Sequence, residues 1–73
     1  MFVRHIHHRA RTIAALRESV RSLQRLLETE RRIADGSDPD LVMRARSEIP
    51  RLEALIAEAE ARIAAVEALP PIA

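Results

Sequence analysis

The sequence contains no cysteine, no tryptophan and no tyrosine, and it has one glycine and one phenylalanine in 73 residues. Without cysteine, disulfides and thiolate metal sites are excluded, and the redox compartment is left open. Without interleaved aromatic residues, the chain lacks stacking platforms for single-stranded nucleic acid. Lysine is also absent, so all twelve basic residues are arginine, which we attribute to coding bias.

Long apolar runs are missing as well. No stretch approaches the roughly 18 to 20 apolar residues of a membrane span, and no signal-peptide core follows the first residues. We therefore expect a cytoplasmic protein. The net charge of +1 does not require a polyanionic partner, but it is unevenly distributed. Residues 1–34 hold eight arginines against three glutamates, whereas residues 35–73 hold four arginines against eight acids.

What is present is typical of long helices. Hydrophobic residues make up 48% of the chain, which is rich in alanine, leucine, glutamate and arginine. A chain of this length forms one small domain, and two helices bury little core between themselves.

One short stretch, Asp35-Gly36-Ser37-Asp38-Pro39, reads as a helix stop, a turn and a helix start. Gly36 can adopt the left-handed conformation that ends a helix. Ser37 or Asp38 can cap the next helix, and Pro39 suits its first position. So short a connection makes the two helices antiparallel neighbours. The predicted elements are a helix at about 4–34, a turn at 35–38, a helix at about 39–69 and a tail at 70–73.

Apolar residues recur every seven positions on both sides of this turn, as in coiled coils. In the first segment, position a holds Ile6, Ile13, Val20, Leu27 and Ala34, and position d holds Leu16 and Leu23. In the second, position a holds Val42, Ile49, Ile56 and Ile63, and position d holds Ala45, Leu52, Ala59 and Val66. The fold class is therefore an all-α antiparallel two-helix hairpin, which we expect to be completed by association into a four-helix bundle.

The turn also predicts which residues face each other. Folding back at residues 36–37 places Val20 level with Glu53 and Ile13 level with Glu60. At the e positions, Arg17 and Gln24 should face the glutamates of the second helix, which are Glu53, Glu60 and Glu67.

Pro50 lies inside the second predicted helix, where proline costs about 3 kcal/mol. It falls on the outer side, beside Ile49, and Ser47 could cap a fresh helical start. We predict a kink or a one-residue break near residues 46–50.

Two apolar surfaces exceed what a hairpin can bury. The first, which we call the leucine edge, occupies the g positions and consists of Leu26, Ile33, Leu41, Leu55 and Leu69. The second, the alanine face, lies on the second helix and consists of Ala54, Ala57, Ala61, Ala64, Ala65 and Ala68. A helix that is apolar around most of its circumference is usually buried on more than one side. Alternatively, alanine merely fills exposed positions because of its helix propensity. We predict that a protein partner binds the leucine edge together with Ala57, Ala61, Ala64 and Ala68.

Nucleic-acid binding is the competing hypothesis. Four arginines occupy f positions, directly opposite the seam, and a fifth, Arg21, lies near them. They form what we call the arginine ridge, which consists of Arg4, Arg11, Arg21, Arg25 and Arg32. Such a ridge could follow phosphates. A weaker alternative takes the three acids of the turn, Asp35, Asp38 and Asp40, as an acidic tip like that of hairpins that enter the RNA polymerase secondary channel. Capping explains acids at a helix start equally well.

Metal binding and catalysis find little support in the sequence. His5 and His8 are one helical turn apart, and His7 lies beside them, but no carboxylate completes a ligand set. An acid–base pair needs a concave, water-poor pocket, which two helices do not supply. We expect no cofactor, no metal and no enzymatic activity.

The turn and the start of the second helix resemble a known family. The run from Arg32 to Asp40, followed by Arg51-Leu52-Glu53, is similar to the small hairpin co-chaperones of type III secretion needle subunits. The likeness covers roughly residues 20–55. It implies a cytoplasmic protein that shields an aggregation-prone helix. Together with the apolar surplus, it favours a non-catalytic interaction module such as an adaptor, co-chaperone, inhibitor or assembly factor, acting on a partner helix or on itself.

Overall fold

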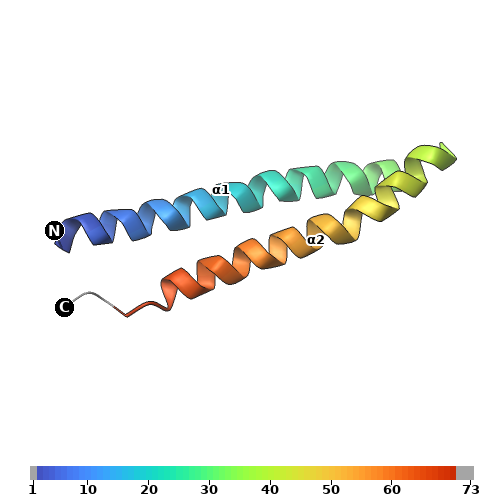
Figure 1. Cartoon of the computed structure of the whole chain (residues 1–73). Coiled ribbons are helices and arrows are strands. Elements are labelled where there is room, and N and C mark those ends of the chain that lie inside the picture. The colour runs from blue at the N-terminus through green and yellow to red at the C-terminus, as the bar shows by residue number, and fades with distance from the viewer. Residues whose placement is uncertain (1, 71–73) are drawn as a thin grey trace.

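The chain folds into two long helices that pack side by side. The computed structural model describes the backbone of residues 2–70 and the side chains of residues 8–70. Helix α1 spans Phe2–Ala34 and helix α2 spans Pro39–Glu67, and the two run antiparallel (Figure 1). They form a rod of 57 × 14 × 11 Å, and the described residues contain no strand. The predicted all-α helical hairpin is thereby confirmed.

The turn is built around Asp38. Its extended backbone precedes α2, and its carboxylate Oδ1 accepts hydrogen bonds from the amides of Asp40 and Leu41 at 3.0 and 3.3 Å. Of the two candidate caps, Asp38 is therefore the one used, and Pro39 follows it at the start of the helix. A negative side chain here also faces the positive end of the helix dipole.

The prediction for Gly36 was wrong in its conformation. Gly36 does not adopt a positive φ, and its amide donates to the carbonyl of Ile33 at 3.0 Å, which tightens the last turn of α1. A Cβ at this position would lie 3.1 Å from that same carbonyl oxygen. Close approach of the backbone, and not a left-handed conformation, accounts for the glycine.

The predicted heptad seam forms the core. The buried residues among those described are Val20, Leu27, Ala45, Leu52 and Ile56. Leu23, Ile49, Ala59 and Ile63 pack against this cluster and are half-buried. All of these residues occupy a or d positions. Ile6, which was predicted for the same seam, lies outside the described side chains. None of the described large side chains is fully buried, because each helix covers only one side of the other.

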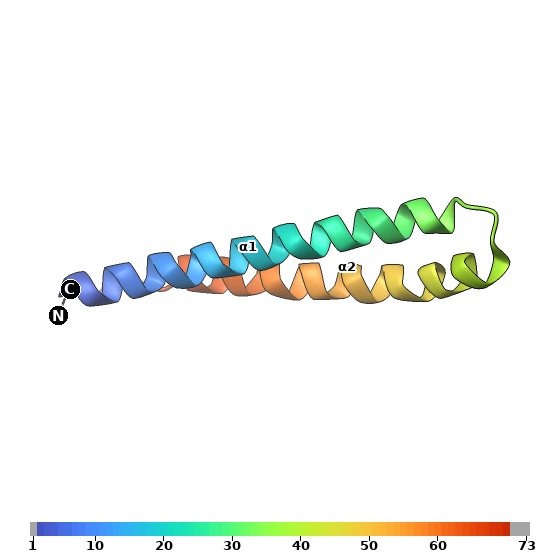
Figure 2. The same ribbon diagram turned by 90° about the horizontal axis from the view of Figure 1, so that it is seen from above.

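The vertical register differs from the prediction by one heptad. Val20 lines the same surface groove as Glu60, and Glu53 pairs with Arg31 instead of lying level with Val20. The connection causes this shift, because it carries the chain past the end of α1 before α2 begins, as Figure 2 shows. Since the shift is seven residues, the a and d positions still face each other.

Pro50 does not interrupt α2, so the predicted break is absent. The helix is continuous from Pro39 to Glu67, and the hydroxyl of Ser47 donates to the carbonyl of Met43 at 3.3 Å instead of capping a new start. Back-bonding of this kind often bends helices. In Figure 1, α2 changes direction in its yellow part, before residue 50.

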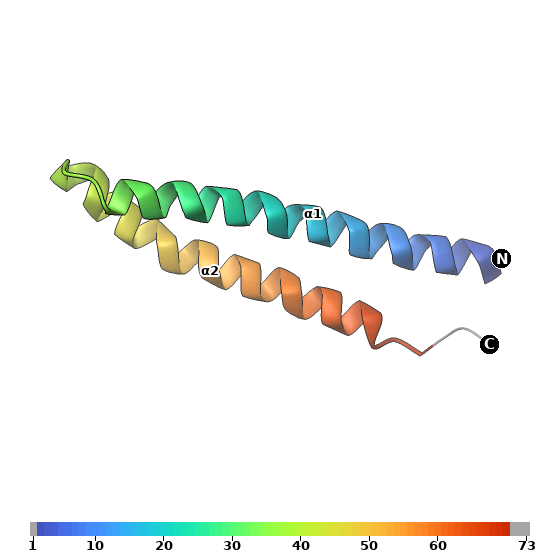
Figure 3. The ribbon, with the colours of Figure 1, turned by 180° about the vertical axis from the view of Figure 1, so that it is seen from behind.

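The helices cross at an angle. In Figures 1 and 3 they overlap near the turn and lie apart toward the open end, whereas in Figure 2 they lie apart near the turn and overlap toward the open end. Ala45, near the turn, has no exposed surface. At the open end Arg9 occupies a d position, and its guanidinium donates to the carbonyls of Leu69 and Pro70.

Candidate interaction surface

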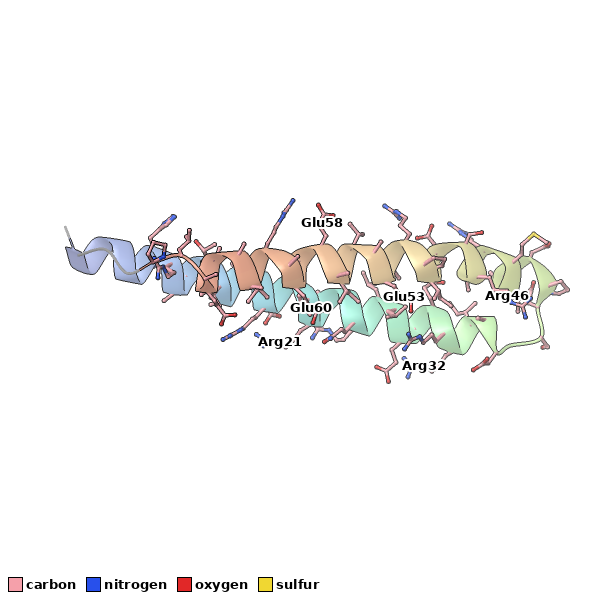
Figure 4. All side chains as sticks on the ribbon, turned by 90° about the horizontal axis from the view of Figure 1, so that it is seen from below. Arg21, Arg32, Arg46, Glu53, Glu58 and Glu60 are labelled. Carbon is pink, nitrogen blue, oxygen red and sulfur yellow. The ribbon has the colours of Figure 1, made fainter. Side chains whose placement is uncertain are left out.

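A charged edge runs along one side of the seam. Arg17 forms an ion pair with Glu67 at 3.0 Å, as the e positions predicted, and Arg31 pairs with Glu53 at 3.3 Å. Figure 4 shows Glu53 and Glu60 along the line where the helices meet. The sequence analysis missed Arg31, although it follows Gln24 by one heptad. Because all four paired side chains are about half exposed, each pair contributes about 0 to 1 kcal/mol.

The leucine edge lies on the other side of the seam and is open to solvent. The exposed fractions are 55% for Leu26, 49% for Leu41, 37% for Leu55 and 52% for Leu69. Ile33 is half-buried. These large apolar side chains are more exposed than any residue of the core, although burial of such a side chain would contribute about 1.5 to 3 kcal/mol.

A shallow groove runs beside this edge. Leu16, Leu23 and Ala59 provide apolar lining, and Leu55 stands at the groove together with Ser19, Glu58 and Arg62. Nearer the turn, a second hollow is lined by Ile33 and Leu41 with Glu30, Arg44 and Glu48. Grooves lined by apolar side chains between two helices are the places where a further helix docks.

Four of the charges on the α2 part of this edge are paired within the helix, and Arg44, in the hollow near the turn, is not among them. Arg51 contacts Glu48 at 3.1 Å, and Arg62 contacts Glu58 at 3.2 Å. One pair lies on each side of Leu55 along the helix. Figure 4 shows Glu58 pointing away from α1.

The c and g positions of α1, which border this edge, carry no arginine, aspartate or glutamate, although Glu30 at a d position lines the hollow near the turn. Eleven charged residues lie between Phe2 and Ala34, and none occupies a c or g position. The described c and g residues beyond His8 are Thr12, Ala15, Ser19, Ser22, Leu26, Thr29 and Ile33. The sequence analysis missed this uncharged strip, although the heptad positions would have revealed it.

Two residues of the alanine face, Ala57 and Ala64, occupy b positions on the opposite flank of α2 from the leucine edge, and most of the others occupy f positions on its outer side. Ala64 lines a groove together with Arg17, Arg21 and Glu67, on the charged side of the seam. The four alanines of the predicted binding surface, Ala57, Ala61, Ala64 and Ala68, are all exposed. One partner helix therefore cannot cover both surfaces. The predicted binding residues therefore lie on separate faces of the hairpin, and their binding of a partner stays a prediction.

The arginine ridge is partly neutralised. Arg21 and Arg25 both contact the carboxylate of Glu18, at 2.7 and 3.8 Å. The hydrogen bond and positive charge of Arg21, with a further contribution from Arg25, lower the pKa of Glu18. Arg11 and Arg32 are exposed, and Figure 4 shows Arg21 and Arg32 projecting from α1 on the side away from α2. The side chain of Arg4 lies outside the described residues.

The remaining candidates contribute little. His8 is exposed, and the side chains of His5 and His7 lie outside the described residues. Within residues whose side chains are described, no three histidine, aspartate or glutamate side chains cluster as metal ligands would. Of the acids in the turn, Asp38 is engaged in capping α2.

No family model, curated protein or solved structure matches the chain.

Neither helix, over the described residues, combines the length and the apolar composition needed to cross a membrane.

Proposed function

We propose that this chain is a non-catalytic protein-interaction module that binds a helix along the leucine edge. The observation that carries the proposal is the exposure of Leu26, Leu41, Leu55 and Leu69 on one side of a hairpin whose own core is small. Isolated exposed leucines are common on protein surfaces. Here they share one heptad position and border a groove with apolar lining.

The helical geometry supports a helix as the ligand. A docked helix would place its apolar side chains against Leu16, Leu23 and Ala59 and would cover the leucines on both rims. Each helix of a four-helix bundle buries its a and d positions and one flanking position. The g residues of both α1 and α2 are suited to that flanking role.

The charged edge is less suited to a helix. Its arginines and glutamates already satisfy each other across the seam, and covering them would remove their hydration. On the α1 side of the leucine edge, Glu30 lines the hollow near the turn, but the c and g positions carry no arginine, aspartate or glutamate, so less charge would lose its hydration there. This difference favours the leucine edge over the other flank.

A role as adaptor, co-chaperone, inhibitor or assembly factor would follow from this mode of binding. Each of these roles requires a small protein that presents or covers one helix. The co-chaperone role, which the resemblance to type III secretion co-chaperones implies, stays a prediction.

The test is photo-crosslinking in the native cytoplasm with a photoreactive amino acid placed at one exposed position. We expect the photoreactive amino acid to yield defined covalent adducts when it replaces Leu26 or Leu55. Ala61, on the alanine face, and Arg32, on the ridge, serve as matched controls and should yield few. Mass spectrometry of the adduct distinguishes a second copy of the chain from another protein.

Two outcomes would refute the proposal. One is the absence of adducts from Leu26 and Leu55 in excess of the controls. The other is a set of adducts concentrated at Ala61, which would transfer the binding function to the alanine face.

A further inference from the structure

We infer that the helix pair bound along the leucine edge belongs to a second copy of this chain, turned antiparallel about a two-fold axis at Leu55. The inference rests on the proposed function, since it names the partner of the same edge. Four-helix bundles form when two hairpins meet in this way.

The charges on the α2 part of the leucine edge are arranged symmetrically about Leu55, with opposite signs on its two sides. Glu48 lies seven residues before Leu55, and Arg62 lies seven residues after it. Arg51 and Glu58 lie four residues before and three residues after the same leucine. When an identical helix runs antiparallel with Leu55 facing Leu55, each of these charges meets one of opposite sign. The pattern is self-complementary, as a two-fold interface requires.

The apolar residues obey the same symmetry. Leu41 and Leu69 stand fourteen residues before and after Leu55, and both are about half exposed. The antiparallel arrangement brings each of them opposite the other across the interface. Leu41 and Leu55 of α2 and Leu69, two residues beyond its end, would then all be covered by equivalent leucines.

The ion pairs already present would combine. The Glu48–Arg51 pair of one copy, 3.1 Å long, would meet the Arg62–Glu58 pair of the other, 3.2 Å long. Alternating charges would then form a group of four on each side of the axis. Networks of this kind are favoured over isolated surface pairs, because several charges share one fixed geometry.

Two hairpins could pack face to face with their turns at opposite ends or at the same end, and the uncharged strip of α1 favours opposite ends. Leu23 shares a groove with Leu55, and Leu27 shares one with Ile56, so Leu26 is level with Leu55. An antiparallel dimer therefore places Leu26 of one copy against Leu26 of the other, and Ile33 of one copy near Ser19 of the other. With both turns at the same end, α1 would instead face α2 of the other copy. The charges of α2 would then be buried against uncharged α1 residues, which is costly.

The surface area agrees with a dimer. The chain exposes 5830 Å². A compact folded monomer of this size exposes roughly 4,500 Å². The excess of about 1,300 Å² exceeds the roughly 800 Å² that each partner buries in a stable interface.

The experiment uses two charge reversals of the full chain, E48R and R62E. In a homodimer of E48R, arginine faces arginine, and in a homodimer of R62E, glutamate faces glutamate. Analytical ultracentrifugation should find the wild-type chain dimeric, and each variant should dimerise about tenfold more weakly or worse, since two contacts change sign. R46E, a reversal at an exposed e position off the leucine edge, should leave dimerisation unchanged.

Mixing the variants is the decisive step. In a dimer of one E48R chain and one R62E chain, both contacts again join opposite charges, while each chain keeps its own altered intrahelical contacts. We expect the equimolar mixture to recover the wild-type dimer fraction. Circular dichroism of each variant checks that the hairpin remains helical. If a reversal unfolds the chain, E48Q and R62Q replace the pair, and each should weaken the dimer.

Several results would overturn this inference. They are a monomeric wild-type chain at millimolar concentration, single variants that dimerise like the wild type, and a mixture that stays monomeric. If the chain is monomeric but Leu55 crosslinks to another protein, only the identity of the partner is wrong. If Leu55 crosslinks to nothing, the proposed function fails as well.

Discussion

The guanidinium of Arg9 reaches across the open end of the hairpin and donates to the backbone carbonyls of Leu69 and Pro70 at 3.2 and 3.0 Å. These carbonyls follow the last turn of α2, where no further helical amide is available to them. A charged residue at a d position is therefore not a defect of the seam. It connects the two helices at the open end of the hairpin.

Replacing Arg9 with alanine should loosen the end of α2. We expect faster hydrogen exchange of the Ala68 and Leu69 amides, which bond to Ala64 and Val66. The loss corresponds to about 1 kcal/mol, or about a fivefold larger open population. The exposed Arg11 provides the control, since its replacement should leave these amides unchanged. Equal exchange in both variants would show that the Arg9 contacts contribute nothing.

Enlarging Ala45 should force the helices apart near the turn. Ala45→Leu adds volume at a site with no exposed surface, and such overpacking costs about 1 to 3 kcal/mol. Ala59→Leu, at another d position that is only half-buried, should be neutral or stabilising. Urea denaturation followed by circular dichroism measures both. If the two variants are equally stable, Ala45 is no more tightly packed than Ala59.

Removing the carboxylate of Asp38 should destabilise the start of α2. Asp38→Ala leaves the amides of Asp40 and Leu41 without their acceptor and should cost about 1 kcal/mol. Asp38→Asn retains an acceptor and should recover most of the loss. Ser37→Ala is the matched control, because the cap is at the next residue. Thermal unfolding gives the comparison, and a larger effect at Ser37 would assign the cap there instead.

Glu18 should titrate abnormally. Its pKa is lowered from the ordinary value of 4.5, chiefly by the hydrogen bond from Arg21. Since the folded-state pKa is the lower one, the stabilising contribution is complete above about pH 4.5 and disappears as the pH falls below that value. Arg21→Ala should return the pKa toward its ordinary value, as measured by carboxyl carbon NMR. Arg62→Ala, which removes a contact to Glu58, should not shift the Glu18 pKa.

Much of the fold could be predicted because its signals are local. The stop and start around Gly36 and Asp38 involve residues within a few positions of each other. The heptad series places Val20, Leu27, Leu52 and Ile56 on one side of each helix without reference to any other element. Even the uncharged strip of α1 was available from the c and g positions, although the sequence analysis did not use them.

The candidate site was predicted less completely. The sequence analysis identified the leucines of the edge but combined them with alanines that lie on the opposite flank and the outer side of α2. It also placed Glu53 level with Val20, whereas Glu53 pairs with Arg31. Met43, which is 72% exposed near the turn, was not assigned to any surface. The register error concerns how one helix is placed relative to the other, whereas the faces of the alanines and of Met43 follow from their heptad positions on α2.

By itself, the sequence determined two amphipathic helices, the turn between them and the residues that face inward, because these depend on spacing along one chain. Only the tertiary structure decided the vertical register and, with it, which residues pair across the seam, such as Arg31 with Glu53. The path of the chain through residues 35–38 sets these features. A backbone displacement of one heptad leaves every local pattern intact and changes every pair across the seam.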